Sequence, residues 1–191
     1  MDGDPIPFTP AGQDAYENNI NGLRDGTVDD FAVTLCVPMG IVRTMGSPYP
    51  FEVIQTPGQI TILMEANNVY RVIRLDSEHS EEAVEIFPGF MGDQIGYWED
   101  DTLVVDTLGV KPYTWLDASG APHGYDLHTV ERIRKIEGGR RLENVITVED
   151  NEFFTMPWRV RYVYEPRPDV SIEVHPCGVH RDLSGVSGVV Q

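Results

Sequence analysis

Apolar and polar residues alternate with a period of two along most of the chain after residue 50. Short runs such as FEVIQ, ITILME and VYRVIRL set β-branched or aromatic residues beside polar neighbours. Because successive side chains of a strand point to opposite faces of its sheet, this alternation is typical of strands with one buried face. The pattern therefore predicts β structure from residue 51 onwards.

Gly, Pro, Asn or Asp stands at the bend between successive runs, as hairpins require. The predicted hairpins are FEVIQ with ITILME, IGYW with TLVVDTL, LHTVERIRKI with RLENVITVE, and WRVRYVYE with VSIEVH. With VYRVIRL, they predict about eight to ten antiparallel strands and no strand–helix–strand alternation. A meander of this size either closes into a barrel or splits into a sandwich, since both protect strand edges. We expect an up-and-down meander closed as a lipocalin-like β-barrel with a ligand-sized interior.

The first fifty residues have a different pattern. FTPAGQDAYENNINGL predicts one short helix, with Thr9 as its N-cap, Pro10 at its first position and Gly22 near its end. Apolar residues are interspersed through 24–50, which predicts an ordered but irregular arm. The residues of the helix expected to face inward are Ala15, Ile20 and Leu23.

Composition fits this fold. The chain has 191 residues, of which 41% are hydrophobic and 24% charged, as in ordinary globular proteins. This length favours a single domain over 1–191, divided into the helix and arm (1–50), the barrel (51–176) and a C-terminal tail (177–191). No apolar run reaches the roughly 18 residues that suggest a membrane span.

The formal net charge of −17 limits the classes of molecule that the protein is expected to bind. A strongly negative protein repels phosphate backbones and anionic lipid, so neither nucleic acid nor a membrane is expected as a partner. A small neutral or cationic ligand is compatible with this charge, and a homodimer stays open. The start, MDGDPIPFTPAG, has neither a basic nor an apolar leader region, so it predicts no signal peptide.

Two long connections, 76–94 and 109–126, interrupt the predicted meander. Both carry histidine and aromatic residues, and long ordered connections in compact β domains often form functional rims. Aromatic residues at a rim suit flat apolar ligands. The expected ligand-contacting residues are His79, Trp98, Tyr113, Trp115 and Tyr125.

The richest polar stretch is APHGYDLHTVERIR, residues 121–134. Its HxxxxHxxE spacing raises the question of a metal site made by His123, His128 and Glu131. Strand periodicity places His128 and Arg132 on one face and Glu131 on the other. Because metal ligands must converge, this disfavours a metal site, and no metal is expected.

Acid–base chemistry is the alternative for the same stretch. His123, in the loop before the strand, can meet His128 at a barrel mouth, and histidine transfers protons near neutral pH. Asp106 lies in the apolar strand TLVVDTLG, where a carboxyl has a raised pKa unless it is paired. Asp106 or Glu131 is therefore the expected partner of the catalytic histidine. Purely structural roles for each of these residues remain the alternative.

Arg71 shares the apolar face of VYRVIRL and is expected inside the barrel. An unpaired buried charge is unfavourable, so Arg71 requires a carboxylate, with Glu65, Asp106 and Glu131 as candidates. A structural salt bridge is the favoured role. In the catalytic hypothesis, Arg71 or Arg132 would stabilise developing negative charge.

Several strings resemble a family of uncharacterised, exported, β-rich proteins of acidobacteria and sphingomonads. They are PYPFEVIQTPGQITILMEANNVYRVIRLD, GDQIGYWEDDTLVVDTLG, APHGYDLHTVERIR and CVPMG around Cys36, with Cys177 late in the chain. The chain departs from the family at DSEHSEE, where the family has Asp-Gly-Arg and then His-Pro around the residue matching His79. It departs again at Gly124, where the family has Ser.

The resemblance implies export, and with it a Cys36–Cys177 disulfide and a periplasmic or exported location. Cysteine content alone is equally compatible with buried thiols in the cytosol. No GxSxG, P-loop or GxGxxG motif is present, so no organic cofactor is expected.

The leading functional hypothesis is a cofactor-independent enzyme acting on a small hydrophobic molecule, aromatic or polycyclic. Its chemistry would be proton transfer by histidine and a carboxylate, as in a lyase, isomerase or cyclase. The alternative is a non-catalytic, lipocalin-like protein that binds the same kind of ligand. Metal-dependent hydrolysis is a third hypothesis.

Overall fold

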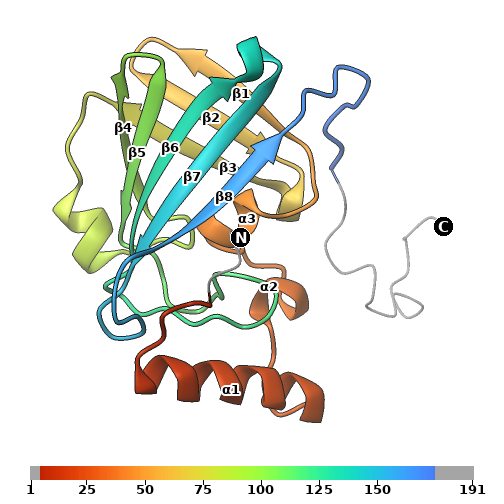
Figure 1. The fold of residues 1–191 in the computed structure, drawn as a ribbon, viewed down its shortest axis with the longest axis vertical. Coiled ribbons are helices and arrows are strands. Elements are labelled where there is room, and N and C mark those ends of the chain that lie inside the picture. Colours follow the sequence, from red (N-terminus) through yellow and green to blue (C-terminus); the bar gives the residue numbers. More distant parts are fainter. Residues whose placement is uncertain (1–4, 175–191) are drawn as a thin grey trace, which may run out of the picture.

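The computed structural model describes residues 5–174, and its centre is one eight-stranded sheet in the order β1 to β8. The sheet curls into a half-barrel (Figure 1). This confirms the predicted mainly β fold. The strands are β1 (Phe51–Thr56), β2 (Gln59–Met64), β3 (Val69–Leu75), β4 (Asp93–Glu99), β5 (Thr102–Leu108), β6 (His128–Ile136), β7 (Arg141–Glu149) and β8 (Trp158–Tyr164).

The expected closure of the barrel is wrong, because β1 and β8 do not pair with each other. The helix α3 (Ile41–Met45) contacts the end of β8 instead. The Tyr164 hydroxyl at the end of β8 donates to the Met45 carbonyl at 3.0 Å. The Phe51 ring of β1 meets the Tyr164 ring edge-on, with 4.8 Å between centroids. Side-chain and helix contacts thus replace the strand ladder that would complete a barrel.

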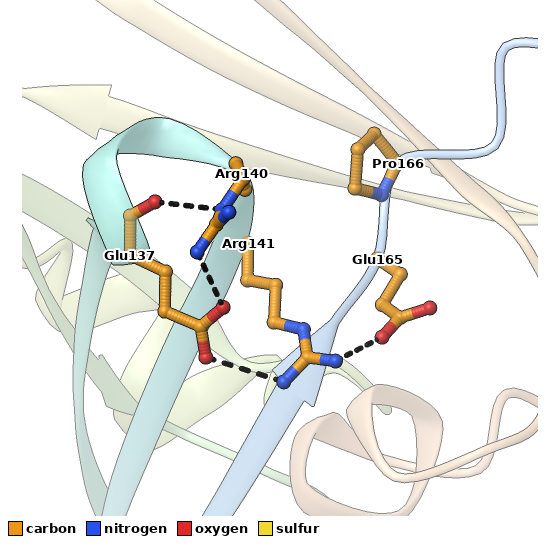
Figure 2. Close-up of a pocket in the computed structure, with 5 residues that line it drawn as sticks. All are labelled: Glu137, Arg140, Arg141, Glu165 and Pro166. Atoms are coloured by element: carbon orange, nitrogen blue, oxygen red, sulfur yellow. Dashed lines mark hydrogen bonds and ion pairs between the residues drawn. The ribbon is translucent and has the colours of Figure 1, made fainter.

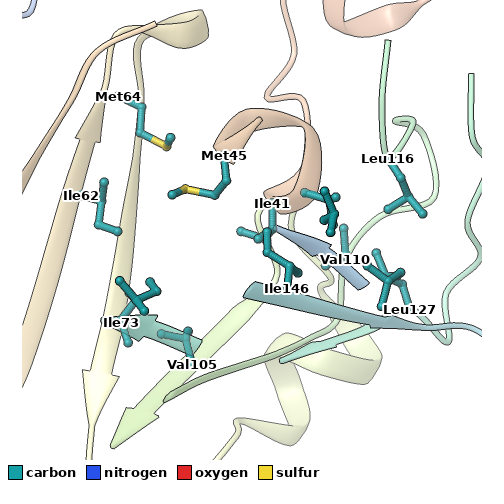
Figure 3. Close-up of a cluster of buried hydrophobic side chains, with 14 of the residues drawn as sticks. Ile41, Met45, Ile62, Met64, Ile73, Val105, Val110, Leu116, Leu127 and Ile146 are labelled. Atoms are coloured by element: carbon teal, nitrogen blue, oxygen red, sulfur yellow. The ribbon is translucent and has the colours of Figure 1, made fainter. Parts of the chain in front are cut away.

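The interior of the half-barrel is packed, which corrects the expectation of a ligand-sized interior. Ile41, Val42 and Met45 of α3 belong to the same buried cluster as the inward residues of the strands. Figure 3 shows Met45 reaching towards Met64 of β2, with Ile146 of β7 near Ile41. Apolar side chains from α3 fill the space that a lipocalin leaves for its ligand.

The strictly up-and-down order also fails at one junction. β3 and β4 pair in parallel, through only Arg74 with Ile95 and Leu75 with Gly96. A parallel pair needs a connection that returns the chain to the end where β3 began. Residues 76–92, with a short helical turn η2 (Glu82–Ile86), make that return. The other neighbouring strands are antiparallel, as predicted.

The predicted N-terminal helix is α1 (Pro10–Asp25), and the Thr9 side chain accepts from the Gly12 N–H as its cap. Gly22 does not end the helix, because Gly26 adopts the left-handed conformation at its C-terminus. Gly22 is buried against Val28 instead. Leu23, expected to face inward, is exposed. None of the helices described is long and apolar enough to cross a membrane.

The arm contains α2 (Phe31–Thr34) and α3, and the short turns η1 (Ala66–Asn68) and η3 (Glu137–Gly139) join strands. The last predicted strand, VSIEVH, is wrong over its described part, since residues 170–174 form no strand. Pro166 and Pro168 lack the N–H groups that pairing beside β8 would use. The predicted disulfide stays a prediction, because Cys177 lies outside the described residues.

Thr129 carries a buried hydroxyl that has no hydrogen-bond partner among the described residues. We expect Thr129→Val to keep or raise the free energy of unfolding, by up to about 1 kcal/mol, because it removes an unsatisfied polar atom. The matched control is Thr44→Val, since the buried Thr44 hydroxyl donates to the Gly40 carbonyl at 2.5 Å. That control is expected to lose about 1 kcal/mol in urea unfolding. Equal losses in both variants would contradict the prediction.

Candidate functional site

The candidate site lies on the outer face of the half-barrel, where β4 begins, β5 ends and β6 begins. Strand register brings its residues together: Asp106 of β5 lies opposite Val130 of β6, and His128 of β6 lies opposite Glu149 of β7. The 76–92 connection adds a histidine from outside the sheet. We call this set the histidine–carboxylate cluster, and its members are Arg74, His79, Asp93, Asp106, His128 and Glu149.

Asp106 is shared by two histidines. His128 Nε2 lies 3.0 Å from Asp106 Oδ2 and 3.2 Å from Oδ1. His79 Nε2 lies 3.0 Å from the same Oδ1. On the other side of its ring, His128 Nδ1 is 3.6 Å from Glu149 Oε2, beyond hydrogen-bond length. This leaves Nδ1 as the ring nitrogen of His128 that a bound molecule can approach.

Asp93 anchors the other end of the cluster. Its carboxylate accepts two hydrogen bonds from the Arg74 guanidinium, at 2.7 and 3.0 Å. It also accepts from the Ser80 N–H and contacts His79 Nδ1, each at 3.0 Å. Asp93 is buried, whereas Asp106 and His128 keep about a third of their side chains exposed, at 29% and 31%. The accessible part of the cluster is therefore the Asp106–His128 pair.

The protonation states follow from these contacts. Burial would raise the pKa of Asp93, but hydrogen bonds from Arg74, Ser80 and His79 outweigh it and lower that pKa to about 2. The pKa of Asp106 is also lowered, because bonds from His128 and His79 outweigh its burial. The hydrogen bond to Asp106 raises the pKa of His128 against partial burial, with help from Glu149. His128 is thus suited to hold a proton near neutral pH.

The opposite shift is found at His123, whose pKa is lowered by burial. We expect NMR titration to place the midpoint of His128 above, and that of His123 below, the ordinary histidine value. His128 therefore stabilises the fold below its unfolded-state pKa and loses this effect as pH rises through its folded pKa. His123 acts in the reverse sense, since its contribution is lost as pH falls below the ordinary value. Midpoints in the reverse order would contradict the assignment.

His123 does not meet His128, which corrects the expected pairing at a barrel mouth. Its Nε2 lies 3.4 Å from the Thr114 hydroxyl, and its Nδ1 lies 3.0 Å from the Gly124 carbonyl. The Gly124 N–H in turn donates to Asp150 at 2.7 Å. Buried loop contacts of this kind hold the 109–127 connection in place and keep His123 away from the exposed pair.

Arg71 and Glu131 form a salt bridge inside the half-barrel, with no solvent exposure of either side chain. Gln94 accepts from Arg71 Nε at 2.9 Å, and Asn144 donates to Glu131 at 2.8 Å. The predicted inward placement of Arg71 and the candidate partner Glu131 are confirmed. Glu131 as partner of the histidine is wrong, because it lies on the opposite face of β6 from His128.

The remaining predicted residues are dispersed. Arg132 pairs with Glu99 on the exposed outer surface, at 2.6 Å. The hydroxyls of Tyr113 and Tyr125 lie 3.5 Å apart, and both side chains are exposed. Trp98 is exposed near the end of β4, whereas Asp93 begins that strand. Trp115 is half-buried beside Gly120. Of the predicted ligand contacts, only His79 belongs to the histidine–carboxylate cluster.

A polar depression of about 430 Å³ lies at the other end of β6 (Figure 2). Its charged side chains neutralise one another, since Arg141 contacts Glu137 at 3.2 Å and Glu165 at 2.5 Å. Its charged side chains are therefore all engaged in ion pairs with one another. Its lining residues are Glu137, Arg140, Arg141, Glu165 and Pro166.

Asp93, Arg74 and Glu149 were not predicted from the sequence as members of the cluster. Arg74 follows Arg71 by three residues in VYRVIRL, so alternation puts it on the opposite face, and Glu149 ends a predicted strand. Nothing local indicates that Asp93 and Asp106 face one histidine, because that contact depends on how the 76–92 connection packs. In residues 5–174, no three His, Cys, Asp or Glu side chains are arranged to hold a metal ion.

Comparison of the chain with protein-family models, with curated proteins and with solved structures finds no match. The resemblance to exported bacterial proteins, and the location it implies, therefore stay predictions. The candidate site has to be judged on its own geometry.

Proposed function

We propose that this protein is a cofactor-independent enzyme that transfers a proton on a small hydrophobic molecule, with His128 as its acid–base group. One observation carries the proposal: the half-exposed His128 is held by Asp106 at Nε2 and presents Nδ1 to the surface beside Glu149. A histidine oriented by a carboxylate is the usual arrangement for general acid–base catalysis. Elimination, isomerisation and cyclisation are the reaction types that such a group serves.

The substrate would bind on the outer face, because side chains fill the interior of the half-barrel. Two connections adjoin the cluster, and they meet where Gly89 bridges to Val110. Their exposed apolar and aromatic side chains provide a surface for an aromatic or polycyclic molecule. These side chains are Ile86, Phe87, Tyr113 and Tyr125.

A non-catalytic protein that binds the same kind of ligand is the second candidate. It is favoured by Asp93, whose carboxylate is already saturated by Arg74, Ser80 and His79. Such a fully paired arrangement also suits a rigid scaffold for a binding surface.

Deuterium exchange separates the two candidates without knowledge of the product. Small apolar compounds with an acidic C–H bond would be incubated with the protein in D₂O and followed by NMR or mass spectrometry. An enzyme of the proposed type should catalyse deuterium incorporation into at least one compound class, and His128→Asn should slow it strongly. Binding without exchange would support the second candidate, and exchange that His128→Asn does not slow would contradict the role of His128.

A further inference from the structure

His79 bridges two carboxylates that come from two different strands. Its Nδ1 lies 3.0 Å from Asp93 Oδ2 and its Nε2 lies 3.0 Å from Asp106 Oδ1. Ionised carboxylates only accept hydrogen bonds, so both ring nitrogens of His79 must donate. A neutral imidazole has one N–H, whereas an imidazolium has two. Both contacts can therefore exist together only while His79 carries its second proton.

His79 also fastens the 76–92 connection to the sheet. Within residues 5–174, its contact with Asp106 is the one side-chain hydrogen bond between this connection and β5. The connection has other anchors, namely the Ser80 N–H on Asp93, the Arg74 guanidinium on the Glu78 carbonyl and the Gly89 N–H on the Gly109 carbonyl, each at 3.0 Å. The His79–Asp106 contact adds a side-chain hydrogen bond to β5 beside them.

We infer that His79 is a positioning residue that, as an imidazolium, fixes Asp106 for His128 and holds the 76–92 connection closed against β5. The inference rests on the proposed function, because it concerns the same Asp106–His128 pair. When His79 gives up its proton, one of its two bonds is lost and the hold on β5 or on β4 is weakened. Loss of a proton thus loosens the connection at one of the two carboxylates, and where that carboxylate is Asp106 it leaves Asp106 to His128 alone.

The charges around His79 support this direction. Asp93 of β4 and Asp106 of β5 face it directly, Arg74 of β3 lies behind Asp93, and His128 of β6 lies behind Asp106. Two positive imidazoles that share one carboxylate repel each other. Removing the charge of His79 should therefore raise the titration midpoint of His128.

Two substitutions at position 79 test the inference. His79→Gln offers a single neutral donor group, so the connection should be loose at every pH. His79→Arg keeps two donating edges and a charge that does not titrate, so the connection should stay closed at every pH. The wild type, as the doubly donating imidazolium, should resemble His79→Arg, and His79→Gln should be looser than both.

The readouts are hydrogen-exchange protection factors of the amides in 77–88, corrected for intrinsic exchange, and NMR titration of the His128 ring. We expect about a tenfold or larger loss of protection in His79→Gln relative to the wild type, as for one charge-assisted hydrogen bond. Amides of β5 and β6 serve as the internal control. Protection in 77–88 that is unchanged in His79→Gln, or a His79→Arg variant as loose as His79→Gln, would overturn the inference. Neither readout needs a substrate, so failure of this inference can be distinguished from failure of the proposed function.

Discussion

Glu131→Gln is expected to lower the free energy of unfolding by about 3–5 kcal/mol, because it leaves the Arg71 guanidinium buried without its counter-charge. Both side chains of this pair are fully buried, so water cannot replace the lost carboxylate. Urea unfolding followed by circular dichroism measures the change.

The neighbouring residue provides a matched control. Arg132 lies beside Glu131 on β6 but faces outward, where it pairs with Glu99 at the surface. Arg132→Met should change stability only within the small range of exposed ion pairs. The double variant Arg71→Met with Glu131→Gln should recover part of the loss, since no unpaired charge remains inside. If Glu131→Gln and Arg132→Met unfold at the same urea concentration, the buried pair is not the source of stability assigned to it.

His128→Asn is expected to lower turnover by about 10²- to 10⁴-fold, the range that a positioned acid–base group contributes. The substrate is the compound class identified by deuterium exchange, and the values compared are kcat and KM. Because the substrate would bind through the apolar side chains of the two connections, KM should change little.

His123→Gln is the matched control for this variant, since His123 is buried in the 109–127 connection and does not contact the histidine–carboxylate cluster. Its turnover should stay within a few-fold of the wild type once the variant is shown to be folded. A larger loss in His123→Gln than in His128→Asn would reverse the assignment of the two histidines.

Strand alternation predicted the faces of individual residues well. It separated Arg71 from Arg74 on β3 and Glu131 from Arg132 on β6, and the structure places one of each pair inside and the other outside. This property is local, because the side-chain direction in a strand depends only on the count of residues along it.

The way strands and connections meet was not predictable from alternation. The alternation of apolar and polar residues in VYRVIRL is compatible with either parallel or antiparallel pairing of β3 with β4. The crossover through 76–92 decides this pairing. His79 reaches Asp93 and Asp106 only through that crossover. Contacts between residues far apart in the chain depend on register and packing, which no short sequence window contains.

The helix α3 shows most plainly that packing can override local conformational preference. Its sequence IVRTM is rich in β-branched residues, which favour strands over helices, and yet it forms a helix inside the half-barrel. Burial of Ile41, Val42 and Met45 against the curled sheet outweighs that local preference. The chain's own pattern thus determined the strands, their faces and the inward charge at Arg71. The open edge, the filled interior and the joining of His79, Asp106 and His128 were decided by packing, because burial free energy exceeds local propensity wherever the two disagree.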